Sequence, residues 1–291
     1  MRSANSDPLL HIRVLLVMGR ISNLPTVWSN CLAGWLLGGG GEAARFNLLC
    51  LGATLVYLGG MFLNDAFDVG FDSQHRRQRP IPAGLIDVGT VWKLGFASLA
   101  LGLLTLAWLG KVTGVLALLL VVAVVIYDAV HKAVTLAPVL MALCRLLLYL
   151  VAASTTREGV VGLAVWSGLA LALYVVGLSY LARHESTPRP VRWWPLSLLA
   201  APVALALVVN TEAYAQLAWW LSLILACWII RCLRHTFGQG PHDVGRTVAG
   251  LLAGIVWVDL LAVAGMSIGI CLAFAALFAL ARLSQRFVPA T

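Results

Sequence analysis

The sequence predicts an all-α membrane protein, a polytopic bundle of nine to ten transmembrane helices that forms one domain over residues 1–291. Two observations lead to this prediction. Hydrophobic residues make up 61% of the chain and charged residues only 11%, whereas an ordinary soluble domain has about 45–50% apolar and about 25% charged residues. The apolar residues also gather into long runs, which excludes a water-soluble globule and a disordered chain.

Ten apolar segments are candidates for membrane-spanning helices, which need about 20 apolar residues to cross the hydrocarbon layer. They are residues 12–37, 46–64, 92–110, 112–127, 134–153, 159–181, 193–209, 214–233, 247–264 and 268–283. The seventh segment is short and contains Pro195 and Pro202, and the last two are separated only near residues 265–269. A nine-helix bundle therefore stays open beside a ten-helix one.

The positive charges are distributed unevenly between the two ends of these segments. With ten spans and a cytoplasmic N-terminus, only Arg45, Lys111 and Arg157 of the 20 basic residues lie outside, as expected when basic loops stay in the cytoplasm. We therefore expect an integral protein of the bacterial inner membrane, surrounded by lipid. The basic residues form no stripe on a polar surface, so neither nucleic acid nor an obligate protein partner is predicted.

The polar residues at the cytoplasmic end of the second segment point to chemistry. Asp65, Asp68 and Asp72 are separated by three and four residues, so in a continuing helix they lie on one face together with Asn64. These carboxylates repel one another and lie near a helix C-terminus, where negative charge costs about 0.3–1 kcal/mol per residue. They therefore require a cation.

The Arg-rich loop that follows the aspartates suggests which ligand this cation would hold. Mg²⁺ takes oxygen ligands and often binds one or two carboxylates together with substrate phosphates. Arg79 is able to hold phosphate oxygens in a bidentate manner. The pattern favours a phosphate or diphosphate bridged by Mg²⁺, and a solvated loop whose Asp and Arg residues pair with one another is the alternative.

The same residues resemble the motif of a known family. Asn64-Asp65-x-x-Asp68-x-x-x-Asp72, followed by Arg79-Pro80-Ile81-Pro82-Ala83-Gly84, is similar to the first aspartate-rich motif and trailing loop of the UbiA superfamily of intramembrane prenyltransferases. Residues 57–84, 126–154 and 180–185 are most similar to the branch found in ebo operons. The resemblance implies a helical bundle around a lipid-open cavity, with Asp65, Asp68 and Asp72 as catalytic residues that bind Mg²⁺ on a prenyl diphosphate.

The second aspartate-rich motif of that family is incomplete in this chain. Between the sixth and seventh segments, where the family usually has a pair of aspartates, the chain reads Tyr180-Leu181-Ala182-Arg183-His184-Glu185. Glu185 is the only acidic residue there, so two complete metal sites are not expected. Arg183 could take the place of one metal ion and hold the diphosphate directly.

Further candidate substrate ligands are polar residues within or beside the apolar segments. An ionisable side chain in the hydrocarbon costs about 2.5–3.5 kcal/mol on insertion scales, so it usually faces a cavity or a partner. The candidates are Arg20, Asn23, Arg145 and, through the family resemblance, Lys132 as a diphosphate ligand and Tyr127 as a cavity-wall residue.

Each of these candidates also has a structural interpretation. Arg20 and Arg145 could form ion pairs, and Asn23 could form an interhelical hydrogen bond. Lys132 lies four residues after Asp128 and could pair with it at the end of a helix. For Asp259, alone in the ninth segment, we expect a structural partner such as an arginine on a neighbouring helix.

The site and the resemblance together imply transfer of an isoprenoid group from a prenyl diphosphate to an aromatic or lipid acceptor within the membrane. Mg²⁺, Arg79 and Lys132 would neutralise the charge that develops on the departing diphosphate, and apolar walls would exclude water. Three alternatives stay open: a terpene cyclase, a transferase of phosphoribosyl-type groups, and a non-catalytic isoprenoid-binding or transport protein.

Overall fold

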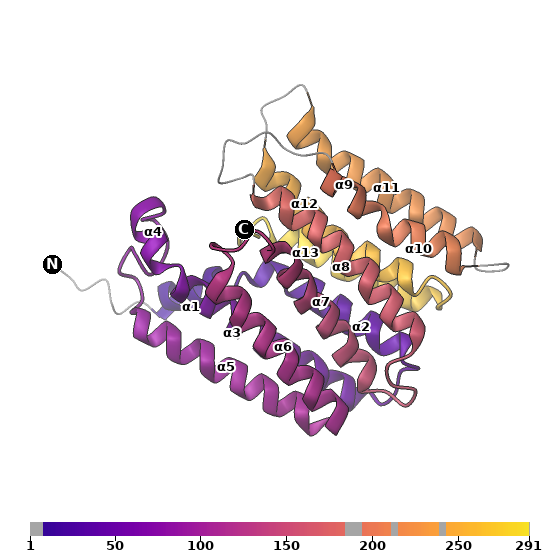
Figure 1. Cartoon of the computed structure of the whole chain (residues 1–291), viewed down its shortest axis with the longest axis horizontal. Helices are drawn as coiled ribbons and strands as arrows, with labels where there is room; N and C mark the ends of the chain where they lie inside the picture. Colours follow the sequence, from indigo (N-terminus) through magenta and orange to yellow (C-terminus); the bar gives the residue numbers. More distant parts are fainter. Residues whose placement is uncertain (1–7, 184–193, 211–214, 239–242, 291) are drawn as a thin grey trace.

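The described part of the protein is a bundle of helices. The computed structural model describes residues 8–183, 194–210, 215–238 and 243–290, and all the regular secondary structure in these ranges is helical. The helices run side by side, with α5 at one edge of the bundle and α10 and α11 at the opposite edge (Figure 1). The all-α prediction is confirmed.

Within the described ranges, seven helices are long and apolar enough to cross a membrane. They are α3 (Ala43–Phe67), α5 (Val88–Trp108), α6 (Lys111–Val130), α7 (Ala137–Ser154), α8 (Gly162–Ala182), α11 (Ala215–Phe237) and α12 (Val244–Ala262).

Three of the ten predicted segments form shorter or broken helices. Residues 12–37 divide into α1 (Pro8–Met18), η2 (Ile21–Asn23) and α2 (Leu24–Leu37). Residues 194–209 form α9 (Trp194–Ser197), η4 (Leu198–Ala200) and α10 (Ala201–Val209), and the last segment forms α13 (Ile268–Ser284). Prolines lie in the first turn of both α2 and α10, where they cannot supply the backbone N–H that would continue a preceding helix.

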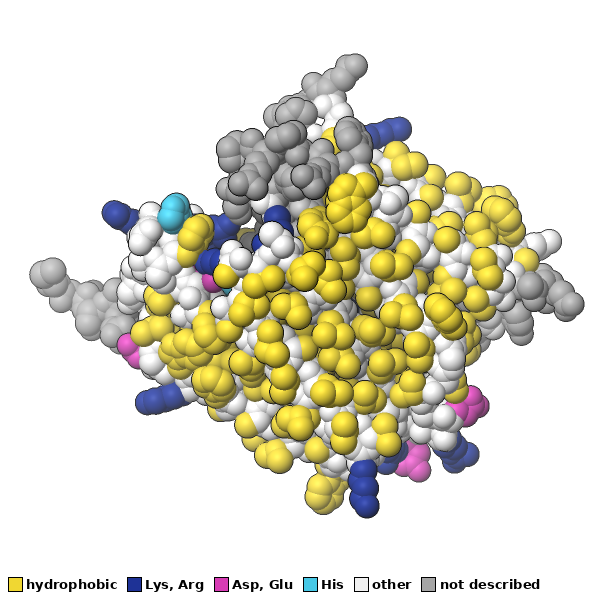
Figure 2. Space-filling view, viewed as in Figure 1, with side chains coloured by type: hydrophobic (Ala, Val, Ile, Leu, Met, Phe, Trp, Pro, Cys, Tyr) yellow, Lys and Arg dark blue, Asp and Glu magenta, His cyan; other side chains and the backbone are white. Residues whose placement is uncertain are grey.

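The outer surface is apolar over its middle and charged at its margins. Figure 2 shows a broad hydrophobic face, with Lys, Arg, Asp and Glu side chains gathered at its edges. Leu104, Val115 and Trp166 are each more than 60% exposed on this kind of surface. Exposure of such a surface to water would cost free energy, whereas contact with lipid would not. The chain is an integral membrane protein.

Close packing of α3 against α5 fixes the helix that carries the aspartates. Gly52 and Gly59 on α3 face Gly102 and Gly95 on α5, and a Cβ added at Gly59 would lie 2.9 Å from the carbonyl oxygen of Gly95. Small residues allow two membrane helices to approach so closely that their backbones touch. The C-terminal end of α3 is therefore held at a defined place in the bundle.

Candidate active site

The aspartates lie where α3 gives way to α4 (Val69–His75), so the helix does not continue unbroken through Asp72. Asp68 occupies the turn between the two helices, but its amide still donates to the carbonyl oxygen of Asn64 at 3.0 Å, and the amide of Asp72 donates to that of Asp68 at 2.9 Å. The helical spacing therefore survives the break. Asn64 and the three aspartates are all buried, with at most 8% of each residue exposed.

Basic residues from three other parts of the chain meet these aspartates. We call the assembly the polar cluster; it consists of Arg20, Asn64, Asp65, Asp68, Asp72, Arg79, His131 and Lys132.

Arg79 joins two of the aspartates. Its Nη1 lies 2.8 Å from Oδ1 of Asp65, and its Nε lies 3.7 Å from Oδ2 of Asp72. Arg20 reaches the same cluster from the other side, with Nη2 3.4 Å from Oδ1 of Asp65 and 3.3 Å from Oδ1 of Asn64. The planar guanidinium group explains how one side chain serves two carboxylates. Asp65 thus lies between two arginines.

Lys132 pairs with Asp68, so the structural alternative, a pair with Asp128, is wrong. Its Nζ lies 2.7 Å from Oδ1 of Asp68 and 4.0 Å from the centre of the Phe71 ring, whereas Asp128 accepts a hydrogen bond from Nδ2 of Asn64 at 3.1 Å. Lys132 lies in the turn after the end of α6, and its side chain reaches Asp68 on the neighbouring part of the chain and not Asp128 in the last turn of α6.

His131 is a member of the polar cluster that the sequence analysis did not single out. Its Nε2 lies 3.4 Å from Oδ1 of Asp68. Burial by itself would raise the pKa of Asp68, but the hydrogen bonds from His131 and Lys132 outweigh burial and hold this pKa below its usual value. The signal that could have found His131 is its position beside Lys132, directly after an apolar segment.

A break in the first predicted segment brings Arg20 to the polar cluster. Arg20 follows Gly19 and has a left-handed backbone, with φ of 41°, a conformation that is uncommon outside glycine. Its carbonyl oxygen accepts hydrogen bonds from the Tyr57 hydroxyl at 3.1 Å and from the backbone N–H of Asn23 at 3.0 Å. These contacts stabilise the bend that directs the guanidinium group away from the helix.

The structure places the other two candidates from the first and fifth segments in contacts between helices. Nδ2 of Asn23 donates to the carbonyl oxygen of Ala290 at 2.9 Å, beyond the end of α13. Arg145 donates from Nη1 to Oδ1 of Asn30 at 2.7 Å and from Nη2 to the Thr26 hydroxyl at 3.1 Å. These hydrogen bonds do not involve Asp65, Asp68 or Asp72.

Asp259 has structural partners on a neighbouring helix, as expected, but among the described residues these are not arginines. Its Oδ2 accepts hydrogen bonds from the hydroxyl of Ser29 at 2.5 Å and from Nδ2 of Asn30 at 2.7 Å. Arg145 is connected to Asp259 indirectly, by donating to Oδ1 of Asn30. Two short polar side chains on α2 thus reach Oδ2 of the buried carboxylate, whereas its Oδ1 is buried without a hydrogen-bond partner.

Arg183 lies at the end of α8 and bonds to backbone atoms. Its Nη1 donates to the carbonyl oxygen of Thr135 at 2.8 Å, and its Nη2 donates to that of Val134 at 2.9 Å. These bonds tie α8 to the loop before α7. Glu185, the remaining acid of the incomplete second motif, lies outside the described residues.

An apolar cavity of about 90 Å³ opens beside the polar cluster, between α2, α3, α6 and α7. Its wall includes Tyr57, Met61, Tyr127, Asp128 and Arg145, and most of its remaining lining is aliphatic. Met61 connects the cavity with the polar cluster, because its sulfur lies 3.6 Å from Nη1 of Arg20. Charged groups at one end and apolar walls behind them suit an amphipathic molecule with an anionic head and a hydrocarbon tail.

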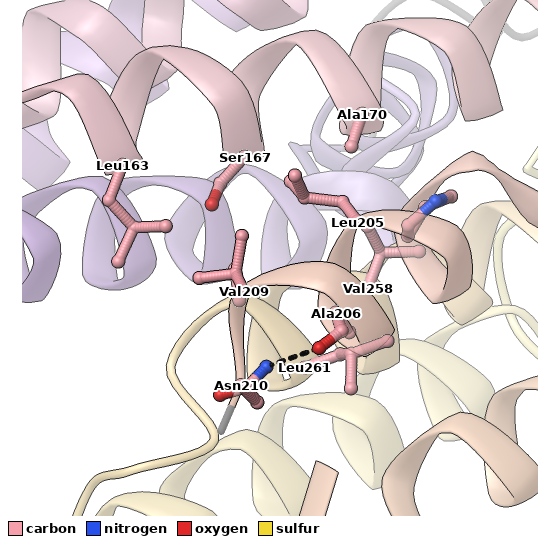
Figure 3. Close-up of a pocket in the computed structure, with 11 residues that line it drawn as sticks. Leu163, Ser167, Ala170, Leu205, Ala206, Val209, Asn210, Val258 and Leu261 are labelled. Carbon is pink, nitrogen blue, oxygen red and sulfur yellow. Dashed lines mark hydrogen bonds between the residues drawn. The ribbon is translucent and has the colours of Figure 1, made fainter. Parts of the chain in front are cut away.

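A second pocket, of about 40 Å³, lies between α8, α10 and α12, near the start of α8 and thus far from Arg183 at its end. Figure 3 shows its apolar lining, in which Nδ2 of Asn210 donates to the carbonyl oxygen of Ala206 at 2.9 Å. Among the described residues, the side chains that line this pocket are uncharged.

The carboxylate oxygens of the polar cluster fit a magnesium ion that also binds phosphate. Carboxylate oxygens are the ligands that Mg²⁺ prefers, and Oδ1 of Asp72 is buried without a hydrogen-bond partner. Within the described ranges, no three His, Cys, Asp or Glu side chains form a ready metal cage. Because Mg²⁺ commonly combines one or two carboxylates with phosphate oxygens and water, such a cage is not required.

Curated proteins similar to this chain come from archaea. Digeranylgeranylglyceryl phosphate synthase of Metallosphaera sedula is 29% identical over 150 residues, which cover 51% of this chain and 43% of that protein. The protein of the same name from Ignicoccus hospitalis is 34% identical over 117 residues, which cover 40% of this chain and 38% of that protein. The chain thus matches less than half the length of either relative.

Solved structures share the fold over nearly the whole chain. A UbiA homologue from Archaeoglobus fulgidus, bound to GPP and Mg²⁺, has a TM-score of 0.67 at 16% identity, with 93% of this chain and 99% of that chain covered. The apo structure of a UbiA homologue from Aeropyrum pernix K1 has a TM-score of 0.67 at 18% identity, with 86% and 99% covered. At these identities the similarity establishes the fold alone.

The sequence model of the UbiA prenyltransferase family matches residues 24–237, about three quarters of the chain. This range includes the aspartates, Arg79, His131 and Lys132. The bundle, its apolar surface and the match agree with one another. The chain belongs to the UbiA prenyltransferase family.

Proposed function

We propose that the protein is an integral-membrane prenyltransferase that moves an isoprenoid group from a prenyl diphosphate to a hydrophobic acceptor. The observation that carries this proposal is the position of the polar cluster at one end of the apolar cavity. A prenyl diphosphate has the matching distribution of charge and hydrocarbon. Family membership and the GPP and Mg²⁺ bound to the Archaeoglobus fulgidus homologue support it.

In this proposal Asp65, Asp68 and Asp72 hold Mg²⁺ when it is bound, and the ion supplies positive charge that stabilises the departing diphosphate. Arg79 and Lys132 now compensate the same carboxylates at 2.8 Å and 2.7 Å. Once the carboxylates have another cation, both side chains are free to donate to diphosphate oxygens. Arg20 and Asn64 complete the anion site.

The walls of the cavity hold the isoprenoid chain and exclude water. An allylic cation develops as the C–O bond to the diphosphate breaks, and water would capture it. Tyr127, Tyr57 and the aliphatic residues behind them provide a dry surface for this carbon chain. The acceptor then forms its new bond to this allylic carbon and releases a proton, which the diphosphate held at the polar cluster takes up before it leaves.

A lipid is the acceptor class that we favour over an aromatic acid. The name of the two archaeal relatives, digeranylgeranylglyceryl phosphate synthase, supports this preference. Arg183 and Glu185 are proposed to contact the substrate at the incomplete second motif, and Asn23 and Arg145 to shape the site through the helices that they connect.

The proposal includes the arrangement in the membrane. If the broken first segment, residues 194–209 and α13 cross together with the seven long helices, the bundle has ten spans; if one of them lies on the surface, it has nine. We place the N-terminus and the polar cluster on the cytoplasmic side of a bacterial inner membrane, and we treat residues 1–291 as one domain of the ebo-like branch.

A direct assay tests the proposed function. Purified protein in lipid nanodiscs is incubated with Mg²⁺, labelled prenyl diphosphates of several chain lengths and a membrane lipid extract. The expected result is diphosphate release together with a prenylated lipid, both lost in the Asp68→Ala variant. Release with a free hydrocarbon would instead indicate a cyclase, binding without release would indicate a carrier, and full activity of Asp68→Ala would contradict the assignment of the site.

A further inference from the structure

The apolar cavity beside the polar cluster has a depth that its lining residues define. On each of three helices these residues run from the near end, at the polar cluster, to the far end: Met61 to Ala53 on α3, Asp128 to Leu120 on α6 and Met141 to Leu148 on α7. At about 1.5 Å per helical residue, each of these runs is about 10–12 Å long. The three helices therefore agree on one depth.

The far end of the cavity is closed by buried side chains. Ala53, Leu120 and Leu148 contribute one side chain from each helix, and they are 2%, 3% and 8% exposed. About one helical turn farther from the polar cluster, Leu49 on α3 and Ala117 on α6 are 0% exposed and belong to the packed core. A hydrocarbon chain that enters from the polar cluster thus meets packed side chains and has no path beyond them.

The sides of the cavity are also closed in its far half. The half-buried lining residues of α3 and α6, which are Tyr57, Met61, Val124 and Tyr127, all lie within about one helical turn of the near end. An opening toward lipid is therefore confined to the half beside the polar cluster. The far half encloses whatever lies in it.

This depth can be compared with the length of an isoprenoid chain. Three backbone bonds of an extended peptide span about 3.3–3.6 Å, so the four carbon–carbon bonds of one isoprene repeat span about 4.4–4.8 Å. A depth of about 10–12 Å accommodates between two and three repeats. A fourth repeat would have to displace side chains of a closely packed interior, which resists added volume.

We propose that the protein selects prenyl diphosphates of two or three isoprene units, and that Ala53, Leu120 and Leu148 set this limit at the far end of the cavity. This inference rests on the proposed prenyl transfer and adds the chain length of the donor. The three side chains act by their volume alone, because each is apolar and lies away from the charged groups that hold the diphosphate.

The wild-type protein in lipid nanodiscs tests the inference directly. Geranyl, farnesyl and geranylgeranyl diphosphate, with two, three and four units, are supplied in turn with Mg²⁺ and a membrane lipid extract, and diphosphate release gives kcat/KM. Since one methylene group in a hydrophobic pocket discriminates by about 10- to 200-fold, kcat/KM for the four-unit donor should lie at least about 10-fold below that of the better shorter donor.

The result separates this inference from the proposed function. Equal or higher kcat/KM for the four-unit donor overturns the chain-length limit and leaves the proposed transfer intact. If no donor releases diphosphate, the proposed transfer fails, and the Mg²⁺-dependent dissociation constants of the three donors decide on the limit by the same order.

Two variants should move the limit in opposite directions. Leu120→Ala removes a far-end side chain next to the small Ala117 and deepens the cavity by about one helical turn, 5.4 Å, so kcat/KM for the four-unit donor relative to the three-unit donor should rise about 10-fold. Ala53→Leu fills the far end and should shift the preference about 10-fold toward the two-unit donor. Leu104→Ala, on α5 at a position 67% exposed, is the matched control and should keep the wild-type order.

Unchanged donor ratios in both far-end variants would overturn the assignment of the limit to these side chains, and opposite shifts support it. Size-exclusion chromatography shows whether each variant is folded. If one of them is not, the other variant and the wild-type series decide.

Discussion

Replacement of Arg79 by lysine is the most informative perturbation of the polar cluster. Arg79 uses two separate nitrogens, Nη1 at 2.8 Å from Asp65 and Nε at 3.7 Å from Asp72. A lysine keeps the charge but has a single ammonium group, so it cannot occupy both positions at once. One buried carboxylate, that of Asp65 or Asp72, therefore loses a cationic neighbour. The paired N–H donors of the guanidinium group, which could bind two diphosphate oxygens, are also lost.

The expected size of the effect follows from these contacts. Loss of a buried ion-pair partner can cost about 3–5 kcal/mol, but Arg79 is 20% exposed in its side chain and Arg20 also faces Asp65. We therefore use the value for one charge-assisted hydrogen bond, about 1.5–3 kcal/mol. At about 1.4 kcal/mol for each factor of ten, turnover should fall about 10- to 150-fold.

The assay is Mg²⁺-dependent diphosphate release in nanodiscs, with the thermal unfolding midpoint measured in parallel. Arg77→Lys is the matched control, because Arg77 lies in the same loop, is exposed and donates from Nε to the carbonyl oxygen of Ser73 at 3.3 Å. Turnover of Arg79→Lys within twofold of the wild type, or equal losses in both variants, would refute the reasoning.

Three further predictions concern packing, burial and the metal. Gly59→Leu should prevent α3 from approaching α5, because even a Cβ would lie 2.9 Å from the Gly95 carbonyl oxygen, whereas Gly162→Ala, with open space around it, should leave the yield of folded protein unchanged in size-exclusion chromatography. Asp259→Ala should lower the free energy of unfolding by about 1–3 kcal/mol, since the buried donors of Ser29 and Asn30 would lose the oxygen to which both donate; an unchanged unfolding midpoint would contradict this. Chelation of Mg²⁺ should abolish turnover while the folded bundle, followed by circular dichroism, persists; turnover that survives chelation would exclude a role for the ion.

Local properties of the sequence were sufficient for the class of protein and for the position of the motif. Apolar runs identify membrane helices because a backbone in lipid must satisfy its own hydrogen bonds. The spacing of Asp65, Asp68 and Asp72 is itself a helical property, and it survives the turn at Asp68 because the backbone hydrogen bonds continue across it. The resemblance to the UbiA family rested on these residues and is confirmed by the family match.

The partners of the charged residues depended on tertiary structure. Lys132 binds Asp68 and not Asp128, and the hydrogen bonds to Asp259 come from Ser29 and Asn30 and not from an arginine. The helix break at Gly19 and the left-handed Arg20 likewise had no clear signal in an apolar run. Such outcomes depend on which helices become neighbours.

The sequence by itself determined that this chain is a helical membrane protein with an aspartate-rich motif at the end of one helix, because hydrophobicity and helical periodicity act over a few residues. Only the tertiary structure decided which cations face which carboxylates and which side chains close the far end of the cavity. Arg20 and Asn64 are 44 residues apart, and Asn64 and Asp128 are 64 apart. Contacts over such separations are set by the packing of whole helices, which no local pattern encodes.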